Sequence, residues 1–131
     1  MIYLDPAAIV KLVHAEADSA ALGRWLGERQ GTPWVTSALA EVEVPRALRR
    51  WAPQALERVE PVLATLYRME ITAEVRTIAA GFGDPLLRSL DAIHLATAQR
   101  LGSELDAFVT YDTRLLAAAG AAGLPTTAPV A

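Results

Sequence analysis

The chain has 131 residues, of which 53% are hydrophobic, and this length and apolar content predict one domain with its own core. It contains no cysteine, which excludes thiol catalysis, cysteine-ligated zinc and disulfide cross-links. The formal net charge is −3, but 11 of the 12 basic residues are arginine, which suits bidentate contact with phosphate, so a nucleic-acid partner is not excluded.

The N-terminal half predicts short strands that are each followed by a helix. The expected elements, in chain order, are a strand at residues 2–4, a helix at 6–14, a helix capped by Asp18 or Ser19 and broken at 31–33, a strand at 34–36 and a helix capped by Ser37. Pro6 suits the first position of a helix, where its missing N–H has no partner to lose. Pro45 interrupts the third helix and is expected to kink it.

The C-terminal half continues the same alternation. Its expected elements are a helical stretch opened by Pro53 and interrupted by Pro61, a strand at 69–71, a helix from its cap Thr72 to about Ala80, a loop at 81–89, a helix at about 90–101, a strand at 107–110, a helix ending near Ala119 and a strand near 125–128. We therefore predict an α/β fold, an α/β/α sandwich around a central, mainly parallel sheet of four to five short strands.

The N-terminal sequence predicts no targeting segment. Asp5 interrupts the apolar run too early for a signal peptide, and no basic residue precedes that run. No apolar stretch approaches the roughly 20 residues that a membrane span needs. We expect a cytoplasmic protein without membrane association.

Two predicted strands end in an aspartate. Asp5 follows the first strand and Asp112 follows the strand at 107–110. In open parallel sheets, ligands bind outside the carboxyl ends of the strands, so both acids are expected at one ligand-binding edge. Aspartate is also a common turn and N-cap residue, and for each acid this structural interpretation stays open.

Two further acids are placed where they could join this edge. Glu43 lies on the helix after the second strand and is long enough to reach back over the strand ends. Asp91 lies in the first turn of a later helix, where it would also complement the helix dipole. His94 follows Asp91 by three residues and could orient its carboxylate, or could be a surface histidine.

These four acids favour a hard divalent cation. With only oxygen donors and no cysteine, Mg²⁺ or Mn²⁺ fits the site better than zinc. Grouped carboxylates repel one another without a cation, whereas a bound cation removes that repulsion and can activate a water and stabilise charge on a phosphoryl group.

Basic residues lie close to these acids in the sequence. Arg46 and Arg50 follow Glu43 by three and seven residues, on the same face of an unkinked helix, and Arg114 follows Asp112 by two. We predict that these arginines contact the phosphate backbone of a nucleic acid. The alternative for each is a solvated position with an ion pair.

Four segments, in this order, resemble the VapC-type toxins of the PIN-domain superfamily: MIYLDPAAIVKL, SALAEVEVPRALRR, LRSLDAIHLATA and FVTYDTRLLAAA. The resemblance covers nearly the whole chain and is loose only at about residues 52–80. It implies that Asp5, Glu43, Asp91 and Asp112 hold the metal. Glu41 competes with Glu43, which we prefer because its following residues match the family segment better.

The resemblance also implies a function. It implies a single PIN-like domain over residues 1–131, acting as an Mg²⁺- or Mn²⁺-dependent endoribonuclease that is the toxin of a type II toxin–antitoxin pair. The implied partners are an RNA substrate and a VapB-type antitoxin, and the toxin is expected to be a homodimer or part of a larger toxin–antitoxin assembly.

One departure from the family pattern leaves an alternative open. The family usually has Ser or Thr directly after the first acid, whereas this chain has Pro6, so Thr110 is the candidate to supply a hydroxyl instead. The alternative is a degenerate PIN domain that binds RNA or a protein without cutting. Two other strand-then-acid families are disfavoured: a dehalogenase-like phosphatase needs an acid where Ala7 stands, and a response-regulator receiver needs a late lysine, whereas the only lysine is Lys11.

Overall fold

A computed structural model describes all residues, 1–131, as an α/β structure built on a parallel sheet. Its five strands are β1 (Ile2–Leu4), β2 (Trp34–Ser37), β3 (Tyr67–Met69), β4 (Ala107–Val109) and β5 (Thr126–Thr127). They are ordered β3-β2-β1-β4-β5, and every neighbouring pair is parallel. The predicted α/β class and the predicted number of strands are both confirmed.

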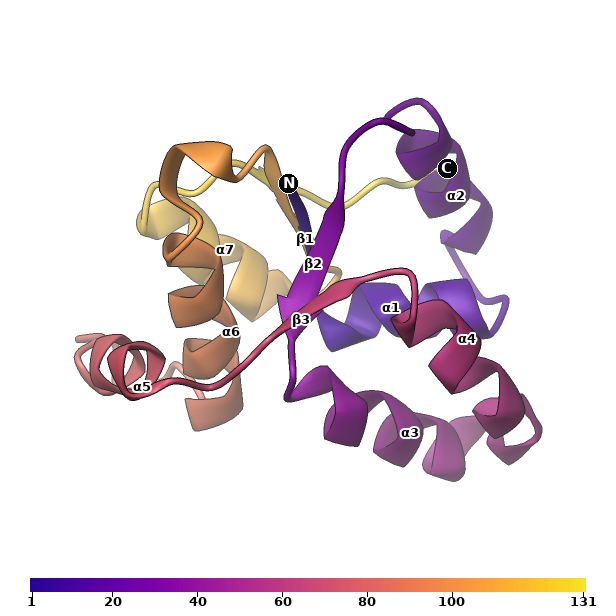
Figure 1. Cartoon of the computed structure of the whole chain (residues 1–131), viewed down its shortest axis with the longest axis horizontal. Coiled ribbons are helices and arrows are strands. Elements are labelled where there is room, and N and C mark those ends of the chain that lie inside the picture. The colour runs from indigo at the N-terminus through magenta and orange to yellow at the C-terminus, as the bar shows by residue number, and fades with distance from the viewer.

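Seven α-helices and two short 3₁₀ helices connect and cover the strands. They are α1 (Pro6–Val13), α2 (Ser19–Gly27), α3 (Ala40–Trp51), η1 (Pro53–Arg58), α4 (Val59–Leu63), α5 (Ala73–Ala80), α6 (Ser89–Gln99), η2 (Gly102–Glu104) and α7 (Thr113–Ala121). Helices α1 to α4 lie on one side of the sheet and α5 to α7 on the other (Figure 1). No helix combines the length and the apolar character needed to cross a membrane.

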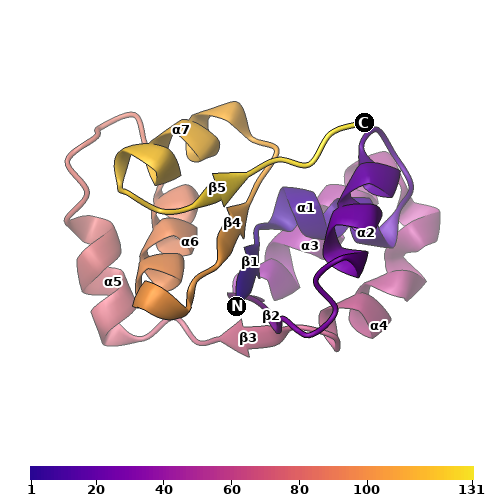
Figure 2. The same cartoon turned by 90° about the horizontal axis from the view of Figure 1, so that it is seen from above.

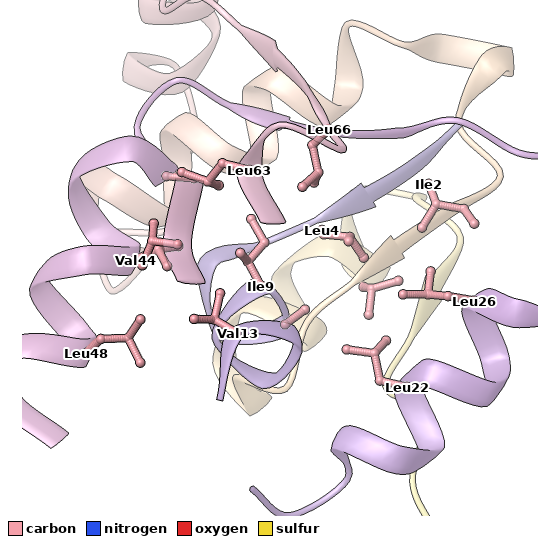
Figure 3. Close-up of a cluster of buried hydrophobic side chains, with 14 of the residues drawn as sticks. Ile2, Leu4, Ile9, Val13, Leu22, Leu26, Val44, Leu48, Leu63 and Leu66 are labelled. Carbon is pink, nitrogen blue, oxygen red and sulfur yellow. The ribbon is translucent and has the colours of Figure 1, made fainter. Parts of the chain in front are cut away.

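The three central strands are short and buried, with one apolar cluster on each face of the sheet. Ile2 and Leu4 of β1 pack with α1 to α4 in the larger cluster, whereas Tyr3 packs with α6 and α7 in the smaller one. Successive side chains of a strand point to opposite faces, so the alternate residues of β1 belong to different clusters. Figure 3 shows the larger cluster, where Leu22 and Leu26 of α2 face the strand from one direction and Val44 and Leu48 of α3 from another.

Two local predictions are wrong, and both errors have a physical reason. Ser37 is the last residue of β2 and does not cap a helix; its hydroxyl accepts the Leu39 N–H in the turn before α3. The third strand lies two residues earlier than predicted, at Tyr67–Met69, where it pairs with Val35–Ser37. It is an edge strand, where the exposed Tyr67 and the charged Arg68 are tolerated, and its position is set by its register against β2.

The topology brings the ends of β1 and β4 to one edge. These strands are direct neighbours and parallel, with Leu4 opposite Val109. Their carboxyl ends therefore release the chain side by side, into α1 and into the turn before α7. Figure 2 shows the five strands crossing between the two groups of helices, with β1 and β4 adjacent at the centre.

Candidate active site

Asp5 is a buried carboxylate whose two oxygens accept hydrogen bonds from different groups. The residue is only 3% exposed. Oδ1 accepts the Ala8 N–H at 3.0 Å and so caps α1, while Oδ2 accepts the Thr110 hydroxyl at 2.6 Å. The capping interpretation is therefore correct for one oxygen, and the other is held at the strand edge by a residue from the end of β4.

Asp112 repeats this division. Its Oδ1 accepts the backbone N–H groups of Arg114 and Leu115 and caps α7, while Oδ2 accepts from the Arg88 guanidinium at 3.2 Å. The Thr110 hydroxyl, besides donating to Asp5, accepts the Asp112 N–H at 3.1 Å. Thr110 thus links the two strand-end acids through one oxygen atom.

Arg88 joins Asp91 to this group. The Arg88 Nε donates to Asp91 Oδ2 at 3.1 Å, while its Nη2 contacts Asp112. Asp91 lies in the first turn of α6 and does not cap that helix. A single guanidinium therefore bridges two of the four predicted acids, across 24 residues of sequence between Arg88 and Asp112.

Glu43 is held by a different partner. Its Oε1 lies 2.6 Å from His94 Nε2, and His94 Nδ1 lies 2.7 Å from the Tyr3 hydroxyl. The expectation that His94 orients Asp91 is wrong, because its ring nitrogens contact Glu43 and Tyr3 instead. The alternative of a surface histidine is also wrong, because the residue is only 1% exposed.

Burial and charge perturb three groups at this edge. Burial raises the pKa of Asp5 from its ordinary 3.8 to about 6, although the hydrogen bonds from Thr110 and Ala8 oppose this shift. The pKa of Arg88 is raised by its hydrogen bond and charge attraction to Asp91 and by the charge of Asp112. Burial raises the pKa of Tyr3 well above its usual value, and the negative charges of Asp5 and Glu43 add to this. The acids at this edge therefore feel one another's charge.

The predicted RNA-contacting arginines differ in how near they lie to the acids. Arg114 lines a cavity of about 570 Å³ together with Asp91 and Arg88, and a second, smaller one together with Asp112. Arg46 and Arg50 are exposed on α3, and the Arg50 guanidinium lies 5.2 Å from the centre of the Trp51 ring.

The rejected alternative to Glu43 lies elsewhere. Glu41 points to the surface, where its carboxylate forms an ion pair with Arg68 at 2.8 Å. Glu43, two residues later on α3, contacts His94 of α6 instead. Of the two acids, only Glu43 has a hydrogen bond to a residue of α6, the helix that carries Asp91.

The donor set fits a hard cation, although the side chains are engaged with protein partners. No group of three His, Asp or Glu side chains is arranged here to share a metal ion. Arg88 contacts Asp91 and Asp112, and His94 contacts Glu43. The available atoms are carboxylate oxygens, which suit Mg²⁺ or Mn²⁺. The buried Asp5 and the guanidinium between two acids indicate that this edge attracts positive charge.

Sequence reasoning missed two residues of this site. Arg88 precedes Asp91 by three residues, which is a spacing that predicts an ion pair at a helix start, but its second contact with Asp112 requires the fold. Tyr3 lies inside a β-type run, where a tyrosine is equally expected as a core residue. No local signal distinguishes its hydroxyl contact with His94.

Known proteins resemble this chain over nearly its whole length. Residues 2–121 match the model of the PIN domain. Among curated proteins of Mycobacterium tuberculosis, ribonuclease VapC35 is 53% identical, with 98% of this chain and 97% of that protein covered. Ribonuclease VapC46 is 46% identical and ribonuclease VapC47 is 41% identical, with the same coverage.

A solved structure supports the fold independently. The crystal structure of Mycobacterium tuberculosis VapC20, described as a toxin that cleaves the sarcin-ricin loop, superposes with a TM-score of 0.72. It covers 95% of this chain and 96% of that one at 16% sequence identity, so this likeness bears on the fold alone. Taken with the family match and the identity to the curated relatives, the chain belongs to the PIN-domain family and, within it, to the VapC-type ribonucleases.

Proposed function

We propose that this protein is the ribonuclease toxin of a toxin–antitoxin pair and that Asp5, Glu43, Asp91 and Asp112 hold the Mg²⁺ or Mn²⁺ on which RNA cleavage depends. The observation that carries the proposal is the shared edge itself. Asp5 and Asp112 each use one oxygen to cap a helix and direct the other to Thr110 or Arg88. Asp91 joins them through the same arginine.

The proposed chemistry is hydrolysis of an RNA phosphodiester. A bound divalent cation supplies a Lewis acid that lowers the pKa of a water and stabilises charge on the phosphate. The protein contributes carboxylates whose positions are fixed by backbone caps and by Thr110. Arg88 and Arg114, both exposed beside Asp91, offer guanidinium groups to the RNA backbone. Arg46 and Arg50 extend this basic surface along α3.

Thr110 takes the place of the hydroxyl that Pro6 cannot provide. The family usually has a hydroxyl residue directly after the first acid, and here the hydroxyl on Asp5 comes from the end of β4 instead. This contact supports an active enzyme in spite of Pro6.

The partners proposed for the protein follow from its relatives. The related VapC proteins are named ribonucleases, and VapC20 is described as a toxin that cleaves the sarcin-ricin loop. We propose an RNA substrate, a VapB-type antitoxin, a homodimeric or larger assembly and a cytoplasmic location. The same proposal treats residues 1–131 as one nuclease domain.

The experiment compares Asp91→Asn with Asp18→Asn in an RNA cleavage assay. Asp18 lies outside the site, before α2, in the left-handed backbone region at φ 68°, which asparagine tolerates, so its substitution is a matched control. We expect cleavage by wild type and by Asp18→Asn with Mg²⁺ or Mn²⁺. Asp91→Asn or EDTA is expected to abolish it.

The second candidate is a PIN domain that binds RNA or a protein without cutting it. Pro6 after the first acid is the observation that favours it. Retention of labelled RNA by the wild type, with no cleavage at any divalent cation concentration, would support this candidate and reject the nuclease.

A further inference from the structure

We propose that Tyr3 and His94 form a buried pair of positioning residues that orients Glu43 toward the cation site. The inference rests on the proposed function, and it assigns a task to two side chains outside the set of acids. The pair and Glu43 come from three elements that meet only in the folded protein: Tyr3 belongs to β1, His94 to α6 and Glu43 to α3.

The contacts form a short, continuous chain. The Tyr3 hydroxyl lies 2.7 Å from His94 Nδ1, and His94 Nε2 lies 2.6 Å from Glu43 Oε1. Tyr3 is fully buried and His94 is 1% exposed, whereas the Glu43 side chain is 24% exposed. This series of hydrogen bonds therefore leads from the core of the molecule to its surface and ends on the Glu43 carboxylate.

Aromatic packing holds the two buried rings of this hydrogen-bond series, Tyr3 and His94, in place. The Tyr3 ring stacks on Phe108 of β4, with 5.1 Å between the ring centres and planes 9° apart. The His94 ring meets the Tyr3 ring edge-on, at 6.0 Å and 74°. Both rings have little room to turn, so the direction in which His94 Nε2 points is set by the core.

The chemistry of the partners assigns the protons. A carboxylate only accepts hydrogen bonds, so His94 Nε2 carries the hydrogen that it donates to Glu43. In the neutral imidazole the other nitrogen, Nδ1, then accepts from the Tyr3 hydroxyl. The Glu43 carboxylate thereby selects this tautomer, because the opposite tautomer would direct a lone pair at it. The Tyr3 hydroxyl, which can donate or accept, holds Nδ1 in place.

This arrangement leaves part of Glu43 available. Only Oε1 is engaged by His94, and Oε2 accepts no hydrogen bond from the protein. A histidine that orients an anionic ligand from behind, with its second nitrogen fixed by a further partner, matches the way proteins support metal ligands. Glu41 shows the contrast, since Arg68 holds it on the surface with no buried residue behind it.

The test measures Mn²⁺ affinity by calorimetry, together with RNA cleavage at saturating Mn²⁺ and the melting temperature in EDTA. His94→Leu removes the donor to Glu43, and His94→Gln restores a donor near the position of Nε2. We expect His94→Leu to weaken Mn²⁺ binding about 10-fold or more, whereas His94→Gln stays within about threefold of the wild type. Thr97→Val, which changes a buried residue one turn further along α6, is the control and is expected to keep wild-type affinity.

A double-variant cycle tests whether Tyr3 acts through His94. Tyr3→Phe keeps the ring and its stacking but removes the hydroxyl, and we expect it to weaken Mn²⁺ binding about threefold. In the His94→Gln background, which has no Nδ1 to accept from the hydroxyl, Tyr3→Phe is expected to leave the Mn²⁺ affinity unchanged. This cycle also decides the question if His94→Leu does not fold.

The outcomes separate this inference from the proposed function. Wild type that binds Mn²⁺ and cleaves RNA, with equal Mn²⁺ affinity in His94→Leu and wild type or an additive effect of Tyr3→Phe, overturns the positioning role alone. Wild type that neither binds Mn²⁺ nor cleaves RNA overturns the proposed function, and the positioning role with it. Losses confined to the melting temperature would assign Tyr3 and His94 to the core only.

Discussion

Asp5 illustrates how a single side chain can serve the fold and the site together. One oxygen caps α1 while the other meets Thr110, so the carboxylate position is determined before any ligand arrives. Asp112 likewise caps α7 with one oxygen, while its other oxygen accepts from Arg88. An aspartate at the end of a strand can therefore cap a helix and also belong to the functional site.

The raised pKa of Asp5 predicts a pH-dependent stability in EDTA. Because its pKa is about 6 in the folded protein and near 3.8 in the unfolded chain, the folded state holds this proton more tightly. The resulting stabilisation is complete below about pH 4 and is lost as pH rises through about 6, a change of about 3 kcal/mol for Asp5.

Asp5→Asn removes this titration and retains an oxygen that can cap α1. We expect the variant to be more stable than wild type at pH 8, by up to about 3 kcal/mol, with the difference shrinking toward pH 5. Urea unfolding in EDTA across this pH range measures it. A stability difference that does not change between pH 5 and pH 8 would contradict the assignment.

The two contacts of Arg88 predict that its guanidinium competes with a metal ion for Asp91 and Asp112. Its guanidinium bridges Asp91 and Asp112, so a cation that binds these acids must displace it. Arg88→Gln is expected to raise Mn²⁺ affinity several-fold, by about 1 kcal/mol, and to lower stability in EDTA because two acids lose their partner.

Calorimetric titration with Mn²⁺ measures this effect. Arg76→Gln removes an exposed guanidinium that donates to the Ile71 backbone carbonyl, and it serves as the control. Unchanged or weaker Mn²⁺ binding by Arg88→Gln would mean that the arginine helps to hold the site rather than competing for it.

At the level of elements, features that depend on neighbouring residues in the sequence could be predicted, and features that depend on residues far away in the sequence could not. Thr72 was predicted to cap α5, and its hydroxyl accepts the Val75 N–H at 3.2 Å. The place of β3 depends on its register against β2, which no local pattern contains. The partner of His94 likewise depends on where the fold places α3 relative to α6, because Glu43 lies 51 residues away.

The cap of α5 gives a prediction about stability alone. Thr72→Ala leaves the Val75 N–H without its acceptor and is expected to lower the free energy of unfolding by about 1 kcal/mol. Cleavage by the folded protein is expected to be unaffected, since α5 carries none of the four acids.

Urea unfolding of Thr72→Ala and Thr77→Ala, side by side, isolates the cap. The Thr77 hydroxyl bonds within the same helix to the Ala73 carbonyl and caps nothing. Equal losses in the two variants would show that the effect comes from general changes in α5 rather than from the cap.

For the whole molecule, the parallel sheet is what makes the site possible. β1 and β4 lie side by side, so acids that are far apart in sequence leave the sheet at one edge (Figure 2). Two apolar clusters on opposite faces hold these strands in place. The alternation of strands and helices and the position of the strand-end acids could be expected from the sequence, whereas the order of the strands and the bridging role of Arg88 required the folded chain.

The most direct test of the shared cation site is anomalous diffraction at the manganese absorption edge from crystals grown with Mn²⁺. We expect an anomalous peak among the carboxylates of Asp5, Asp91 and Asp112, with Glu43 beside it and Arg88 turned away from the two acids that it bridges. Crystals of Asp91→Asn are expected to lose that peak. A peak found only elsewhere, with Arg88 still between Asp91 and Asp112, would contradict the account.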